Sequence, residues 1–333
     1  MSEQQHPLVS VLTPVYNGEA FLAECIESVL NQTHKNFEYI IVNNRSKDGT
    51  LEIALDYSKK DQRIKVHNNE TFVPVIENHN IAFSLISGKA KYCKVVSADD
   101  AIFPDCLMGM VEVAESHSSA GIVGCYQQSG NDIRWQGFPY PRVTVSGREL
   151  CKQILLSRNP SFGFGSPTSL LYRADLVRKG REFYPNASAE GDTSACFKHL
   201  KDCDFAFVYQ VLCSEKKHEQ TQSSKSKALN RYASSILRDL IEYGPSYLTE
   251  EERVLAFNEH LKGYYRFLAG SLLGFKGREF WQYHRDRLKE LGYPLRTSRL
   301  LKAGMTKILG EIANPQQAIR KFWNRLPHKY GIQ

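Results

Sequence analysis

Two adjacent carboxylates, Asp99 and Asp100, follow the apolar run at residues 92–96 and precede Pro104. Hard oxygen ligands of this kind suit Mg²⁺ or Mn²⁺ when the ion is held jointly with the phosphates of a substrate. The same two residues could instead cap the helix that Pro104 opens. The pair is therefore a candidate metal site, and the neighbouring loops decide between the two interpretations.

Two earlier loops also place polar side chains directly after apolar runs, at residues 13–17 and 43–50. The second loop contains an Asp-Gly turn signal, and Asn17 and Thr50 are suitable helix caps. Neither loop has the Gly-rich sequence that cradles phosphate groups, which excludes a P-loop and a dinucleotide fingerprint. Taken alone, each loop can equally be a strand end followed by a turn and a cap.

The three polar loops belong to a predicted α/β domain. Five short apolar runs have the length and composition of β-strands: residues 8–12, 37–42, 64–67, 92–96 and 121–126. Apolar residues at helical spacing predict four helices between and after these runs: residues 17–31, 46–60, 75–87 and 104–117. This alternation predicts a mostly parallel sheet flanked by helices. Ligands of such sheets bind outside the carboxyl ends of the strands, where the polar loops lie.

The pattern loosens between residues 129 and 166, where Gly, Pro and aromatic residues dominate. Such a composition favours a binding surface over a core. Residues 168–172 and 205–211 are predicted strands, and residues 192–200 are a predicted helix. The α/β domain therefore extends well beyond the fifth strand.

A polar, lysine-containing segment at residues 223–226 marks a boundary, and the chain after it has a mainly helical pattern. We predict an α/β domain over residues 1–223 and a helical C-terminal region over residues 224–333. With 42% hydrophobic and 24% charged residues, the 333-residue chain is not disordered, collagenous or a coiled coil.

The net charge of +7 arises entirely after Leu291, where eight basic residues accompany one acid, Glu311. The rest of the chain is neutral, so we expect no nucleic-acid partner. Residues 299–313 and 318–326 each place apolar residues on one helical face with basic residues at its sides. This pattern predicts helices that lie in the plane of an anionic membrane surface. The alternative is that both helices pack on the preceding domain.

No run of 18 apolar residues is present, and the first residues lack the basic start and apolar stretch of a secretory signal. The eight cysteines form no C-x-x-C pair, which argues against a zinc ribbon and for free thiols in a reducing compartment. We therefore expect a cytoplasmic protein, peripheral on the inner face of the membrane.

Taken together, the loops resemble those of family 2 glycosyltransferases with the GT-A fold. The matching residues are Pro14, Tyr16 and Asn17 in the first loop, residues 29–33 at a helix end, Ser46, Asp48, Gly49 and Thr50 in the second loop, and Asp99, Asp100 and Pro104 in the third. The resemblance covers residues 7–223. It implies an inverting transfer of a sugar from a nucleotide-diphosphate sugar, assisted by Mn²⁺ or Mg²⁺.

The resemblance also assigns roles to residues. Asp192 would be the general base that deprotonates the acceptor hydroxyl, with Glu190 as the competing choice. Asp100 would bind the metal with Asp99, which also faces the ribose, and His218 would contact the diphosphate or the metal. The remaining donor-binding residues would be Thr13, Pro14, Tyr16, Asn17, Asn43 and Asn44.

The sequence departs from the family pattern at the base pocket. Many relatives carry an Asp where this chain has Asn43 or Asn44, and another Asp where it has Ser97. An Asn oxygen still accepts a hydrogen bond, but the side chain lacks the charge and adds a donor. The nucleotide base therefore stays open, and the metal site depends on Asp99 and Asp100.

The resemblance implies a glycan or lipid-linked acceptor in the synthesis of surface polysaccharide or lipopolysaccharide. Two other functions compete with this interpretation. A sugar nucleotidyltransferase would need a Gly-rich basic loop after the first strand, which residues 13–17 do not provide. A non-catalytic nucleotide-sugar-binding or membrane scaffold protein with a degenerate GT-A site is the alternative that the asparagines leave open.

Overall fold

The computed structural model describes residues 6–138, 140–156, 163–180, 182–185, 190–216, 229–230, 232–272 and 276–313. The chain divides into two compact units, residues 1–219 and residues 220–333. Each unit has its own arrangement of elements, and each is described by itself.

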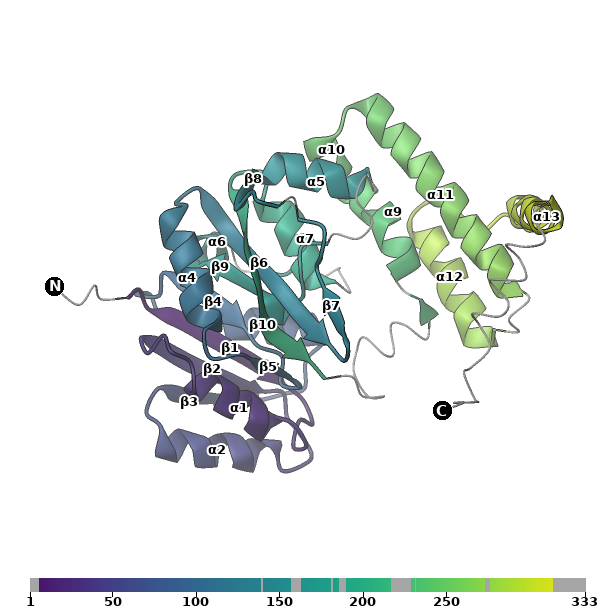
Figure 1. Cartoon of the computed structure of the whole chain (residues 1–333). Helices are drawn as coiled ribbons and strands as arrows, with labels where there is room; N and C mark the ends of the chain where they lie inside the picture. The colour runs from purple at the N-terminus through teal and green to yellow at the C-terminus, as the bar shows by residue number, and fades with distance from the viewer. Residues whose placement is uncertain are drawn as a thin grey trace, which may run out of the picture. The chain divides into compact units, whose positions relative to one another are not determined.

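The first unit is built on one sheet (Figure 1). Its strands are β1 (Val9–Val15), β2 (Phe37–Asn43), β3 (Ile64–Asn68), β4 (Tyr92–Val95), β5 (Asp100–Ile102), β6 (Ala120–Ser129), β7 (Asp132–Arg134), β8 (Thr144–Ser146), β9 (Leu170–Arg173) and β10 (Asp204–Glu215). The strand order is β3-β2-β1-β4-β9-β6-β10-β5, with β7 beside β6 and β8 beside β10.

Helices connect these strands. They are α1 (Leu22–Leu30), α2 (Thr50–Lys60), α3 (Val75–Ser84), α4 (Cys106–Ser116), α5 (Gly147–Leu155), α6 (Ala174–Arg178), α7 (Gly191–His199) and the 3₁₀ turn η1 (Pro167–Ser169). Strands β1, β2, β3 and β4 run in one direction, and β6 and β10 run the same way because β9 is antiparallel to both β4 and β6. The prediction of a mostly parallel sheet flanked by helices is confirmed.

The central strands are apolar because helices cover both faces of the sheet. Every residue of β1 and of β2 is buried, as expected for parallel strands that lie inside a three-layer domain. On the near face in Figure 1, α1 and α4 pack on the sheet and contribute Ile26 and Met110 to its largest apolar cluster. This packing fixes the edge where the strands end.

The first three strands end in register at that edge. Val15 of β1 pairs with Asn43 of β2, and Asn43 pairs in turn with Asn68 of β3. Their last residues therefore open onto one surface, and the loops that follow them lie next to one another. This is the edge at which a parallel sheet binds ligands.

Two segments differ from the sequence expectations. Asp100, expected in a loop, begins the three-residue strand β5, where it pairs with Glu215 of the antiparallel strand β10. A strand this short carries too few residues for a periodic signal. The predicted strand at residues 168–172 is the turn η1 followed by β9, which runs antiparallel to its neighbours.

The second unit is helical. Its described elements are α9 (Tyr232–Glu242), α10 (Gly244–Tyr247), α11 (Glu250–Leu272), α12 (Arg278–Glu290) and α13 (Thr297–Ala313). Tyr264 of α11 and His284 of α12 are buried against each other, with a hydrogen bond between the Tyr264 hydroxyl and His284 Nδ1. None of the helices in the described part of the chain is both long and apolar enough to cross a bilayer.

Candidate active site

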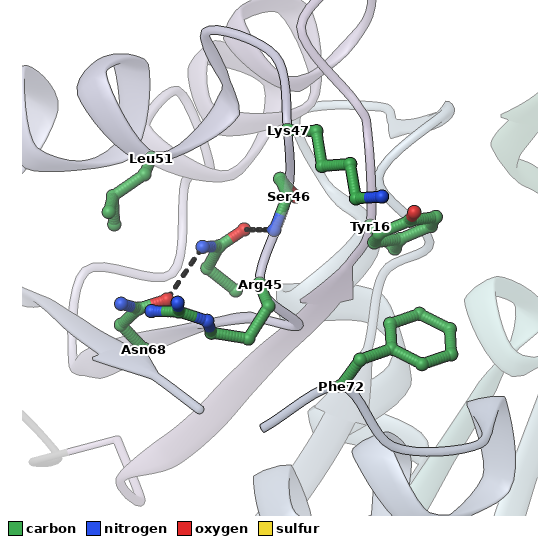
Figure 2. A pocket seen from close by; sticks show the side chains of 8 residues that line it. Tyr16, Arg45, Ser46, Lys47, Leu51, Asn68 and Phe72 are labelled. Carbon is green, nitrogen blue, oxygen red and sulfur yellow. Dashed lines mark hydrogen bonds between the residues drawn. The ribbon is translucent and has the colours of Figure 1, made fainter. Parts of the chain in front are cut away.

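A cleft of about 560 Å³ opens at the carboxyl ends of β1, β2 and β3 (Figure 2). Its lining residues come from the loops after these strands and from the start of α2: Tyr16, Asn43, Arg45, Ser46, Lys47, Leu51, Asn68 and Phe72. Tyr16 and Asn43 were predicted from the sequence to bind a donor. The structure therefore brings two of the predicted residues into a shared cleft.

Two aromatic rings form one wall of the cleft. The rings of Tyr16 and Phe72 meet edge to face with their centroids 4.9 Å apart. Both side chains are exposed, by 43% for Tyr16 and 60% for Phe72. Large apolar rings that stay open to solvent on a rigid sheet edge can stack on a flat ligand such as a nucleotide base.

The amide of Asn43 has a fixed orientation in this cleft. Its Nδ2 donates to Oδ1 of Asn68 over 2.7 Å, and its Oδ1 accepts from the backbone N–H of Ser46 over 3.3 Å, as the dashed lines in Figure 2 mark. Asn43 lines the cleft although only 1% of it is exposed, so a ligand could reach only a small part of its amide. The cleft therefore presents a neutral amide, already oriented by the protein.

Asn17 ties the first loop to the second. Its backbone N–H donates to Oγ of Ser46, and its Oδ1 accepts from the N–H of Lys47, both over 2.9 Å. Asn17 has a φ of 51°, a left-handed conformation that Asn adopts more readily than most residues. The side chain of this predicted donor-binding residue thus positions Lys47, while Tyr16 beside it forms the cleft wall.

The remaining motif residues of the second loop are also used for this cross-link. Thr50 Oγ1 accepts from the N–H of Gly18 over 2.8 Å and donates to Asp48, while the other Asp48 oxygen accepts from the N–H of Glu19 over 3.2 Å. The loops after β1 and β2 are therefore held together by side-chain to backbone bonds. This explains the Ser-x-Asp-Gly-Thr pattern structurally.

Two cations line the cleft. Arg45, whose φ of 58° is left-handed, and Lys47 are both exposed, and neither forms a salt bridge within the described residues. The described lining includes no carboxylate. A left-handed φ is uncommon for a residue such as Arg45, and it destabilises the backbone at that position by about 1 kcal/mol. The cleft is therefore positively charged and suited to an anionic ligand.

Three predicted donor-binding residues lie behind this surface. Thr13 is fully buried, and its hydroxyl contacts the Tyr39 hydroxyl and the Val96 carbonyl, each over 2.9 Å. Pro14 is buried in β1. The amide of Asn44, 2% exposed, accepts from the N–H of Val73 and donates to its carbonyl. These side chains support the loops and do not belong to the described lining of the cleft.

The acidic pair follows β4, the next parallel strand of the sheet: Asp99 lies in the loop after β4, and Asp100 begins β5. β4 neighbours β1, and Ala98 lies close to the first loop, because a Cβ built on Gly18 would be 3.7 Å from the Ala98 Cβ. Asp99 is half-buried and Asp100 is buried. Burial, together with the nearby Asp99 and Glu215, raises the pKa of Asp100 to about 8.

A divalent cation fits this pair. Two adjacent carboxyl groups in a partly buried position repel each other, and a cation between them and an anionic substrate would remove that cost. The described residues contain no group of three His, Cys, Asp or Glu that could enclose a metal by themselves. Mg²⁺ characteristically uses one or two carboxylates plus substrate phosphates, so Asp99 and Asp100 suffice only with a bound diphosphate.

The candidate base lies at the start of a helix. Asp192 is in the first turn of α7, and burial raises its pKa to about 6, although the backbone N–H of Thr193 partly opposes that shift. Its charge acts on the buried hydroxyls of Tyr172 and Tyr184. A carboxylate with this pKa is a stronger base than an exposed one and is still ionised at neutral pH.

Glu190 precedes α7 as its N-cap residue, and its carbonyl accepts from the N–H of Ser194 over 3.0 Å. Gly191 between the two acids leaves no room for a side chain, since a Cβ there would lie 2.8 Å from both Ile76 and Tyr184. The backbone that carries Asp192 is therefore packed tightly against α3. The other predicted contact, His218, lies outside the described residues.

The lining residues that sequence reasoning did not assign to the site include Arg45, Lys47, Asn68 and Phe72. Arg45 and Lys47 are at the non-motif positions of the second loop, and Asn68 and Phe72 follow the third strand. The carboxyl end of that strand was the available signal, because every parallel strand contributes its loop to the same edge.

Comparison with known proteins agrees with this arrangement. The family model described as glycosyl transferase family 2 matches residues 10–181, which is more than half of the chain. The chain therefore belongs to glycosyl transferase family 2. It is similar to a glycosyltransferase of Haemophilus influenzae, described as uncharacterized, with 37% identity over 120 residues. That match covers 36% of this chain and only 36% of the relative's own length.

Solved structures show that the fold is GT-A. S. aureus TarS 1-349 in complex with UDP-GlcNAc superimposes with a TM-score of 0.63 at 19% identity, over 86% of this chain and 80% of that one. The mannosyltransferase PcManGT from Pyrobaculum calidifontis, in complex with GDP-Man and Mn²⁺, gives a TM-score of 0.53 at 12% identity, over 92% and 88% of the two chains. At these identities the likeness concerns the fold.

Proposed function

We propose that this protein transfers a sugar from a nucleotide-diphosphate sugar to a hydroxyl of a glycan or lipid-linked acceptor, with inversion at the anomeric carbon. The observation that carries the proposal is that the cationic aromatic cleft and the Asp99–Asp100 pair lie in the loops that follow the neighbouring parallel strands β1 and β4. The structural neighbours with UDP-GlcNAc and with GDP-Man and Mn²⁺ support this choice of donor class.

The cleft would hold the nucleotide. The base stacks on Tyr16, the oriented amide of Asn43 bonds to its edge, and Arg45 and Lys47 attract the diphosphate. The ribose lies toward Asp99. This arrangement uses both cations of the cleft and leaves the sugar directed toward the end of β4.

Asp100, with Asp99, would hold Mn²⁺ or Mg²⁺, and the bound cation would offset the negative charge that develops on the departing diphosphate. Asp192 accepts the proton of the acceptor hydroxyl. The acceptor oxygen then bonds to the anomeric carbon from the face opposite the diphosphate, whose bond to that carbon breaks. Glu190 is the competing base. One displacement of this kind inverts the anomeric centre.

The acceptor surface would include exposed aromatic rings of the segment between β6 and η1. Tyr140 is 80% exposed and meets Tyr209 edge to face with their centroids 5.2 Å apart. Trp135 donates from Nε1 to Gln127 over 2.9 Å, which fixes the ring. Sugar faces stack on aromatic rings, so this patch suits a glycan.

The C-terminal helices would bring the enzyme to an anionic membrane surface at the cytoplasmic face, where a lipid-linked acceptor for surface polysaccharide or lipopolysaccharide is found. Leu301, Met305 and Leu309 of α13 recur every fourth residue and are exposed by 59%, 59% and 65%. Basic residues such as Lys302 accompany them. The second amphipathic stretch, residues 318–326, lies outside the described residues.

The experiment that tests the proposed function is a transfer assay with UDP-, GDP- and dTDP-sugars and with CMP-linked sugar, each with and without Mn²⁺. The predicted result is metal-stimulated cleavage of one donor, with release of its nucleotide diphosphate and a product of inverted configuration. Tight nucleotide binding without any cleavage would instead identify a non-catalytic binding protein.

A further inference from the structure

The Asp100 carboxylate is held by a threonine from a distant part of the chain. Thr168 is fully buried in the turn η1, and its Oγ1 lies 2.5 Å from Oδ2 of Asp100. The same oxygen accepts from the N–H of Ser97 over 3.1 Å. Its single proton can go to Asp100 or to Oγ of Ser97, which is farther away at 3.3 Å, so Asp100 is the better-placed acceptor. The hydroxyl thus bridges the end of β4 and the side chain of Asp100.

The backbone of Thr168 is itself anchored. Lys94 of β4 is fully buried, and its Nζ donates to the carbonyl of Thr168 and, over 3.2 Å, to that of Leu170. Ser166 and Ser169 close a capping box around the turn. A buried ammonium group is costly unless it is well hydrogen-bonded. Movement of η1 away from β4 would leave the Lys94 ammonium group buried without these partners, so Lys94 holds η1 in place.

We propose, on the basis of the proposed function, that Thr168 is a positioning residue for the metal site. Its hydroxyl fixes Oδ2 of Asp100, whose carboxyl group also accepts from the backbone N–H of Lys216, and it thereby orients that group to bind a divalent cation with Asp99. A ligand carboxylate that is already oriented loses less freedom when the metal binds. The residue lies 68 positions from Asp100 in the chain, which places it outside the acidic motif.

The test measures Mn²⁺ affinity by electron paramagnetic resonance of the unbound ion, with UDP present and, separately, with GDP. Thr168→Val removes the hydroxyl and nearly keeps the shape of the side chain. We expect Mn²⁺ affinity to fall about tenfold, which is the smaller end of the loss typically seen when a residue that hydrogen-bonds to a metal ligand is replaced. Thr168→Ser keeps the hydroxyl and should stay within about twofold of the unmodified protein. Thr168→Ala should show the same loss if the Val variant does not fold.

Ser169→Ala is the matched control, because the bonds of Ser169 Oγ to other described residues all go to Ser166: to its N–H over 2.7 Å, to its carbonyl over 3.1 Å and to its hydroxyl over 3.4 Å. We expect this variant to melt at a lower temperature without metal and to bind Mn²⁺ normally. An equal loss of Mn²⁺ affinity in Ser169→Ala and Thr168→Val would overturn the inference, because loosening of the turn would then explain both.

Asp100→Ala separates this inference from the proposed function. If Asp100→Ala loses Mn²⁺ while Thr168→Val binds it normally, the positioning role of Thr168 is wrong and the metal site stands. If the unmodified protein binds no Mn²⁺ with either nucleotide, both the metal site and the role of Thr168 are wrong. Loss in Asp100→Ala and Thr168→Val, with rescue in Thr168→Ser, supports both.

Discussion

The amide of Asn43 donates to the amide oxygen of Asn68 over 2.7 Å, across the ends of two neighbouring parallel strands. The edge that a donor base would meet is therefore a pair of neutral amides. This pairing makes the charge at position 43 the most direct experimental control over which base the cleft accepts.

Asn43→Asp should tighten UDP binding by about fivefold to tenfold and leave CMP binding unchanged or weaker. The new carboxylate would accept the N3–H of uracil as a charge-assisted bond, whereas N3 of cytosine has no hydrogen to donate. Asn68 must turn its amide to donate to the carboxylate. Calorimetric titration with both nucleotides measures the difference.

Asn44→Asp is the control, because the amide of Asn44 binds both backbone groups of Val73 and is not part of the described lining of the cleft. It should destabilise the protein without discriminating between bases. Equal changes in UDP and CMP affinity for Asn43→Asp would show that Asn43 does not face the base.

Asp192→Asn should reduce transfer on the order of 10²- to 10⁴-fold while nucleotide binding stays within a few-fold, because the amide cannot accept the acceptor proton. Glu190→Gln, two residues earlier, is the matched control and should retain most activity. The reverse outcome, an active Asp192→Asn and an inactive Glu190→Gln, would transfer the role of base to Glu190.

The pH profile of kcat/KM tests the same carboxyl group. Burial raises the pKa of Asp192 to about 6, and only its ionised form can accept a proton. With Mn²⁺ saturating, so that the Asp100 carboxyl group stays ionised, we expect the rate to be constant above that pH and to fall about tenfold per pH unit below it. A profile that is flat down to pH 5, measured where the protein remains folded, would contradict a titrating base at this position.

The edge of the sheet that carries the candidate site followed from the sequence, because the residues after each apolar strand share one edge of a parallel sheet. Tyr16 and Asn43 were found in this way, and so was the position of Asp99 and Asp100. The roles of Thr13 and Asn44 did not follow, since only packing reveals that their side chains turn inward.

Two other features needed the fold itself. Thr168 meets Asp100 only because η1 folds back beside β4, and nothing in the spacing of these residues indicates the contact. Phe72 forms a wall of the cleft from a loop that has no motif. Contacts between distant segments depend on register and on loop paths, which a local pattern does not contain.

Replacement of Leu301, Met305 and Leu309 by Gln should reduce sedimentation of the protein with anionic vesicles and leave nucleotide binding unchanged, because these exposed residues would enter the headgroup region. Salt should release the unmodified protein, since each Lys or Arg near the anionic surface contributes about 1 kcal/mol to membrane binding and salt screens that attraction. Deletion after Leu291 should abolish sedimentation. Equal sedimentation of all forms would leave the C-terminal helices without a membrane role.

Direct observation of donor cleavage tests the central claim most sharply. The unmodified protein and Asp192→Asn are incubated with each nucleotide sugar, a glycan acceptor and Mn²⁺, and the released nucleotide diphosphate is measured. The proposed function predicts that the unmodified protein releases the nucleotide diphosphate of one donor. Asp192→Asn should bind the same nucleotide but release its diphosphate at least about 10²-fold more slowly. Equal release by the two proteins, or no release from any donor, would contradict it.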